Sequence, residues 1–233
     1  MPLRSLSLVL LLAVPAAAEE TIRFDVGLRG LTAAQIALTG RQDGDDYAVS
    51  ARMASTGLVS VISDFAFAAE ARGRMRGRQP APVEARLRDD MGRNRGSVVL
   101  RYSGGVPMVE RVPEREPDPW DIDPADQRGR ADPISVVWAA FRTRPAADIC
   151  NVTLRAFDGR RSGDLVLGPR RAQADGTVTC AGEWVRVAGY DPEDMAERTR
   201  FPFTLTWRPE GEALRLVELR AASRYGDAVL RRR

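Results

Sequence analysis

Apolar and polar residues alternate with a period of two through most of the chain. The first clear example begins at Thr21, where Ile22, Phe24, Val26 and Leu28 alternate with polar or small residues. This alternation is typical of a β-strand with one buried and one solvated face. Similar stretches follow near residues 34–39, 47–53, 65–71, 83–87, 98–102, 151–157, 165–167, 178–188, 201–207 and 214–225. The pattern therefore predicts about eleven strands.

Short turns connect these predicted strands. Asp43-Gly44, Asp158-Gly159 and Asp175-Gly176 are dipeptides that tolerate the positive φ angles of tight hairpins. Consecutive hairpins produce an antiparallel meander, and a large twisted sheet tends to curl or close because open edges are costly. We therefore expect a mostly β protein, built as a single curved antiparallel sheet or a half-open barrel.

One segment, Asp132 to Arg144, has the pattern of a helix. Asp132 is suited to cap the first turn and Pro133 to occupy the first helical position, while Arg142 and Arg144 complement the negative end of the dipole. Its apolar residues recur at helical spacing: Ile134, Val137, Trp138 and Phe141. A stretch rich in proline and charge, residues 112–126, precedes it and predicts a surface crossing. We expect the sheet to be wrapped around this one main helix.

The amino-terminal residues have the layout of a secretory signal peptide. Arg4 precedes an apolar run that ends in small residues, which predicts cleavage after Ala18. The run is short for a permanent span, although a retained anchor is the alternative. Residues 1–18 are thus interpreted as a signal peptide and residues 19–233 as a single exported β-rich domain. We expect a periplasmic protein with no permanent membrane span.

Composition excludes several chemistries. The chain has no histidine and no lysine, so it has no Ser-His-Asp triad, imidazole zinc site, Schiff-base lysine or P-loop lysine. Its 35 basic residues nearly balance its 32 acidic residues and are scattered, so we expect no nucleic-acid partner. The run Arg231 to Arg233 is interpreted as a solvated chain end. We expect a protein that is not an enzyme and that carries no cofactor.

The two cysteines, Cys150 and Cys180, are expected to form a disulfide, because a pair of cysteines in an exported chain is usually oxidised. A bridge of this separation stabilises a fold by about 3 to 4 kcal/mol in the chain-entropy model. A redox role is the weaker alternative, since it would require a close Cys-x-x-Cys pair.

Four carboxylates lie close together in the crossing. They are Asp118, Asp121, Asp123 and Asp126. Such a cluster suggests a hard cation such as calcium, but its spacing lacks the glycine and the distal glutamate of an EF-hand loop. We therefore interpret the cluster as a solvated loop and expect no metal site.

The stretch Cys150 to Leu165 carries a family resemblance. Together with Asp132-Pro133, Ser55 to Leu58 and the second cysteine Cys180, it resembles the exported bacterial family called domain of unknown function 3108. Its most specific piece is the Phe157-Asp158-Gly159-Arg160-Arg161 turn. The resemblance implies no assigned activity, and it implies an architecture similar to lipoprotein carriers of the LolA/LolB type.

The residues leave two functions open. Ile134, Trp138 and Phe141 either line a ligand cavity or fill the core. The first case makes the protein a periplasmic carrier of a lipid or other apolar ligand. The second makes it a structural or protein-interaction module of the cell envelope, with an envelope protein as partner. Arg160 and Arg161 are expected to be solvated charges beside a turn, with an anion contact as the alternative.

Overall fold

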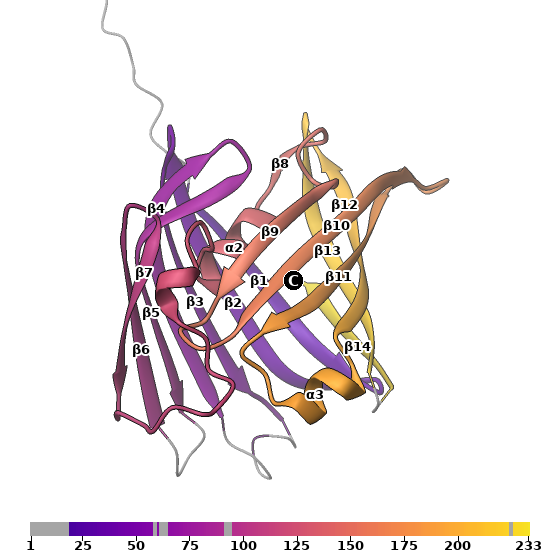
Figure 1. Ribbon diagram of the computed structural model, residues 1–233. Helices are drawn as coiled ribbons and strands as arrows, with labels where there is room; N and C mark the ends of the chain where they lie inside the picture. Colours follow the sequence, from indigo (N-terminus) through magenta and orange to yellow (C-terminus); the bar gives the residue numbers. More distant parts are fainter. Residues whose placement is uncertain (1–18, 58–59, 61–64, 91–94, 224–225) are drawn as a thin grey trace, which may run out of the picture.

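A computed structural model describes residues 19–57, 60, 65–90, 95–223 and 226–233. The predicted signal peptide, residues 1–18, lies outside the described residues. Within them one sheet of 14 strands dominates, and every pairing between its strands is antiparallel (Figure 1). The prediction of a mostly β protein with one large antiparallel sheet is confirmed, and the sheet is not closed.

Two meanders make up the sheet. The first contains β1 (Glu19–Leu28), β2 (Leu31–Asp43), β3 (Asp46–Ser55), β4 (Ala66–Arg76), β5 (Gln79–Asp90), β6 (Arg95–Ser103) and β7 (Val106–Val112). The second contains β9 (Val152–Phe157), β10 (Ser162–Ala172), β11 (Val178–Ala188), β12 (Arg200–Glu210), β13 (Ala213–Ser223) and β14 (Gly226–Arg232). The strand β14 pairs with β1, so the order runs from β7 through β1 and β14 to β9.

The predicted number of about eleven strands was wrong, because β7, β8 (Arg144–Pro145) and β14 were missed. Pro107 lies inside β7, and a proline argues against a strand in a sheet interior. In the structure β7 is an edge strand, and edge strands tolerate proline because one of their sides forms no ladder. The two-residue strand β8 pairs with β13 and is too short for a period-two pattern.

The carboxyl-terminal arginines are part of β14 and its end, not a free solvated tail. Phe24 of β1 is in register with Arg232, and Leu219 of β13 with Leu230. The three guanidiniums of residues 231–233 form ion pairs with Glu218, Glu20 and Asp25, respectively. Arg231 and Arg233 are exposed, which agrees with the interpretation as a solvated end, but these residues belong to a paired strand and its end.

The main helix, α2 (Pro133–Phe141), is shorter than predicted. Its amino terminus is as expected, since the Asp132 side chain accepts a hydrogen bond from the Ser135 N–H at 2.9 Å and Pro133 follows it. The helix ends before Arg142 because Arg144 precedes a proline, which disfavours helical geometry, and begins β8. The Arg144 guanidinium still caps the helix by donating to the Ala140 carbonyl at 2.6 Å.

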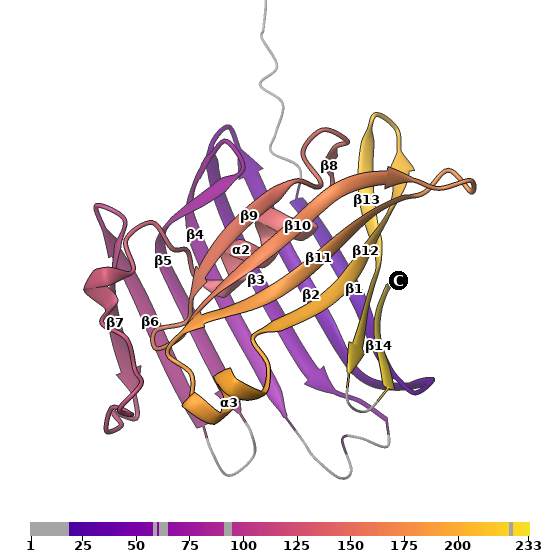
Figure 2. The ribbon, with the colours of Figure 1, turned by 45° about the vertical axis from the view of Figure 1, so that its right-hand side comes forward.

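The helix α2 lies between the two meanders (Figure 2). Two shorter helical turns, η1 (Pro124–Asp126) and α3 (Pro192–Glu197), lie at the periphery. The free edges β7 and β9 do not pair with each other. Instead, Gly129 donates to the Gly105 carbonyl at 2.9 Å beside β7, and Ala131 forms a parallel bridge with Ala156 of β9. The segment between β7 and α2, called the crossing below, therefore connects the two edges.

Among the described residues, no helix is both long and apolar enough to cross a membrane.

The expected disulfide between Cys150 and Cys180 is confirmed, with a Cα–Cα separation of 5.8 Å. It ties the segment before β9 to β11. Replacing both cysteines by serine is expected to lower the free energy of unfolding by about 3 to 4 kcal/mol, because the unfolded chain regains loop entropy. Urea denaturation measures the loss, and reduced wild-type protein should show the same loss. Unchanged stability in both would contradict the expectation.

Candidate functional site

The three residues predicted to contact a ligand lie on the buried face of α2. Ile134, Trp138 and Phe141 have exposed fractions of 6%, 2% and 9%. The Trp138 ring packs directly on the backbone of Gly40 in β2, where an added Cβ would lie 2.8 Å from the ring. Phe141 meets Phe24 edge to face, with ring centroids 6.1 Å apart. These side chains pack against the sheet where α2 crosses it, and their role in lining a ligand site stays a prediction.

A buried polar network anchors the amino terminus of α2. The Ser135 hydroxyl donates to the Asp132 carboxylate at 2.6 Å, and the Tyr47 hydroxyl from β3 donates to the Ser135 hydroxyl oxygen at 2.6 Å. Burial raises the pKa of Asp132 to about 6, against the hydrogen bonds from Ser135, which lower it. Asp132 and Ser135 are both 0% exposed, so this network positions the helix and is closed to a substrate from solvent.

Tyr102 of β6 adds to the polarity near this network. Its hydroxyl is buried and finds no hydrogen-bond partner among the described residues. Burial and the nearby Asp132 carboxylate raise its pKa. An unsatisfied buried hydroxyl is costly, so this position is held in place by the surrounding packing.

The inner face of the sheet is buried near α2 and only half-buried one row farther away. Leu38, Ala51 and Ala69, in register across β2, β3 and β4, are 2%, 7% and 5% exposed. In the next row, away from the Trp138 contact, the corresponding residues are only partly buried. These three residues and three half-buried apolar residues of β11, β12 and β13 are called the inner apolar face. Its members are Ile36, Met53, Phe67, Trp184, Phe203 and Leu219.

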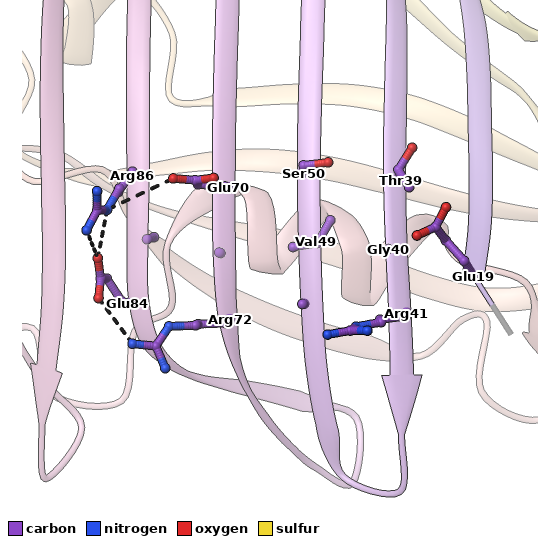
Figure 3. Close-up of a pocket in the computed structure, with 13 residues that line it drawn as sticks. Glu19, Thr39, Gly40, Arg41, Val49, Ser50, Glu70, Arg72, Glu84 and Arg86 are labelled. Carbon is purple, nitrogen blue, oxygen red and sulfur yellow. Dashed lines mark hydrogen bonds and ion pairs between the residues drawn. The ribbon is translucent and has the colours of Figure 1, made fainter. Parts of the chain in front are cut away.

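A cavity of about 490 Å³ opens on the opposite, outer face of β2 to β5. Figure 3 shows α2 behind these strands and the side chains that line the cavity. Ser50 is a small residue among them, and charged side chains surround it. Arg86 and Arg72 both pair with Glu84, at 2.7 and 3.3 Å. Sequence reasoning missed this site, although small and charged residues at outward positions of neighbouring strands were a signal for it.

The carboxylate-rich crossing lies beside the turn formed by residues 157–161. Arg160 forms ion pairs with both Asp118 and Asp121, and Arg115 pairs with the same two carboxylates. Asp123 instead caps η1 by accepting from the Ala125 N–H at 2.8 Å. The interpretation of Asp118 and Asp121 as solvated is therefore corrected. Within the part of the chain that the structure describes, no three potential metal ligands are grouped.

Both arginines of the turn are engaged by their own chain, so the expectation of solvated charges was wrong. The guanidinium of Arg160 binds internal carboxylates, and that of Arg161 lies over the Tyr190 ring at 5.2 Å. The turn itself packs on the other edge of the sheet, because a Cβ on Gly159 would lie 3.0 Å from Val98 and 3.3 Å from Val109. The turn thus joins the β9–β10 hairpin to β6 and β7.

The family model described as "Protein of unknown function (DUF3108)" matches residues 23–180. The match includes the first meander from Arg23 onward, the crossing, α2 and the turn, and it ends at the second cysteine of the disulfide. No curated protein and no solved structure matches the chain. The similarity to LolA/LolB-type carriers therefore stays a prediction.

The buried Asp132 predicts a pH-dependent stability. Its folded pKa of about 6 lies above that of an unfolded aspartate, so protonation favours the fold. This stabilisation is complete below about pH 4 and is lost as the pH rises through 6. Relative to Asp132→Asn, the wild type should therefore lose about 2 kcal/mol of unfolding free energy between pH 4.5 and 7.5. Urea titrations across this range measure the difference, and a difference that does not change with pH would contradict the expectation.

Proposed function

The chain belongs to the DUF3108 family of proteins of unknown function, and we propose that it is a periplasmic, non-enzymatic protein that binds a lipid or another apolar ligand on its inner apolar face. One observation carries this proposal. The inner face of the sheet is sealed where α2 covers it, yet large apolar side chains just beyond the helix keep part of their surface accessible.

The arrangement of the two meanders supports a ligand with a long apolar part. Met53 and Phe67 belong to the first meander, whereas Trp184 and Phe203 belong to the second, and α2 lies between the two (Figure 2). An acyl chain entering beside α2 would contact apolar side chains from both meanders. Removing apolar surface from water contributes about 25 cal/mol per Å², so such contacts favour binding without any polar chemistry.

The composition agrees with binding and not with catalysis. The chain lacks histidine and lysine, and its buried Ser135 and Asp132 are closed to solvent. The exposed fraction of the inner apolar face is the accessible surface that remains for a ligand. A carrier needs this surface and needs no nucleophile.

Met53→Asp tests the proposal, because it places a charge on the inner apolar face. Wild-type protein should rise in melting temperature with dodecanoate, and native mass spectrometry of protein purified from the periplasm should show bound lipid. Met53→Asp should weaken dodecanoate binding at least tenfold, on the order of the cost of a buried unpaired charge.

Met108→Asp is the matched control. Met108 lies on β7 with 57% of its surface exposed, so the same substitution there should leave binding unchanged. Circular dichroism checks that both variants are folded. An unliganded mass for the wild type together with no melting shift in dodecanoate would refute the proposal.

A structural or protein-interaction module of the cell envelope is the second candidate, and the outer cavity favours it. The charged groups around Ser50 would suit an extended, charged segment of an envelope protein. A photo-crosslinking residue at position 50 should then capture one defined protein in cells, and Arg72→Glu should weaken that crosslink. A crosslink pattern that is absent or insensitive to Arg72→Glu would exclude this candidate.

A further inference from the structure

Three arginines gather where α2 ends. Arg142 is the residue that terminates the helix, Arg144 begins β8, and Arg78 comes from the turn between β4 and β5. The Arg78 guanidinium donates to the carbonyls of Cys150 and Asn151, beside the disulfide. We call Arg78, Arg142 and Arg144 the arginine cluster.

Arg144 is buried to a degree that is unusual for arginine. Arg144 is only 4% exposed, and its guanidinium lies 5.8 Å from the centre of the Trp207 ring. Burial lowers the pKa of Arg144 to about 9, and repulsion from Arg142 and Arg78 adds to this effect. Burial also lowers the pKa of Arg142. Arg144 is thus a deeply buried positive charge with two half-buried guanidiniums, those of Arg78 and Arg142, nearby.

No carboxylate neutralises these charges at ion-pair distance among the described residues. Two acids, Glu20 and Asp148, attract the cluster from farther away. Glu20 is already bound by Arg232 at 3.3 Å and by the Thr143 hydroxyl at 2.6 Å. The positive charge of the cluster therefore exceeds the negative charge around it.

Two partly buried arginines elsewhere in the protein have acidic partners. Arg130 pairs with Asp164 at 2.7 Å, and Arg160 pairs with Asp118 and Asp121. Among the described residues the arginine cluster has no such ion pair. Burying an unpaired charge costs several kcal/mol.

Helix and loop capping explains only part of the cluster. Arg144 caps Ala140, and Arg78 binds two carbonyls of the segment around the disulfide. Among the described residues Arg142 has no hydrogen bond from its guanidinium, and the buried Nε atoms of all three arginines find no partner there. A guanidinium has five N–H donors, and only three donors of the cluster bind protein carbonyls, so others are left for a ligand.

We propose that the arginine cluster is a binding site for an oxyanion, a phosphate or carboxylate group, at the carboxyl-terminal end of α2. Planar guanidiniums bind such groups in a bidentate manner, and a bound anion would neutralise the buried charge. Arg142 is only half-buried, so an anion from solvent can reach it. The anion is either free or the head group of an amphiphile. This site does not depend on ligand binding at the inner apolar face.

Thermal unfolding in inorganic phosphate tests the site, with sodium chloride at equal ionic strength as reference. Wild-type protein should melt about 3 °C higher at a phosphate concentration ten times its Kd. Arg142→Gln should abolish the phosphate-specific rise, and Arg142→Lys should restore part of it. Arg155→Gln is the matched control, because Arg155 is an exposed arginine on β9.

Dodecyl phosphate distinguishes the two sources of the anion. A rise with both compounds that depends on Arg142 identifies a site for the free ion, and a rise with dodecyl phosphate alone that depends on Arg142 identifies a head-group site. A rise that persists in Arg142→Gln, or no rise with either compound, overturns the proposal. Met53→Asp should leave the inorganic phosphate effect intact. The experiments therefore distinguish failure of the lipid-binding proposal from failure of the anion-site proposal.

Discussion

The pairing of β14 with β1 and β13 is the constraint on which the rest of the structure depends. The two meanders are far apart in the sequence, and β14 makes them one sheet through ladders on both of its sides. Without it, β1 and β13 would both be open edges, and α2 would face two separate sheets. The ion pair of Arg232 with Glu20 then links this junction to Thr143, directly after α2. The junction therefore fixes both the curvature of the sheet and the position of the helix.

The opposite side of the molecule is joined by a different kind of interaction. Between β7 and β9 there is no strand pairing, and side chains of the crossing and the turn hold the edges together. Partly buried Arg–Asp pairs keep more of their strength than exposed ones, although desolvation offsets some of it. Backbone hydrogen bonds between strands thus join the two meanders on one side of the molecule, and side-chain contacts join them on the other. Such a sheet keeps its inner face accessible without losing its overall curvature.

The sequence predicted elements whose signals are local, and it failed where partners are distant. Alternation identified the strands around residues 22–28 and 47–53, and Asp132-Pro133 marked the start of α2. Pro107 and the arginine-rich end concealed β7 and β14, because local chemistry argued against strands that tertiary pairing nevertheless formed. The contacts of Arg160 with Asp118 and Asp121 cross about forty positions and have no local signature. The arginine cluster and the outer cavity likewise combine residues from separate strands and turns. Periodicity could predict on which face of the sheet a residue lies, but not which residues lie next to it.

The position of Arg233 has a consequence for connectivity. The Arg233 N–H donates to the Arg23 carbonyl at 2.9 Å, so the last residue lies beside β1. A short linker from Arg233 to Glu19, the first residue of β1, would join the two strands in a ring in which every strand ladder is preserved. The ring could then be reopened in the crossing between β7 and α2, where no ladder is interrupted. In that permuted order β14 and β1 would be consecutive strands of one hairpin, and their pairing would become a local contact that forms early in folding.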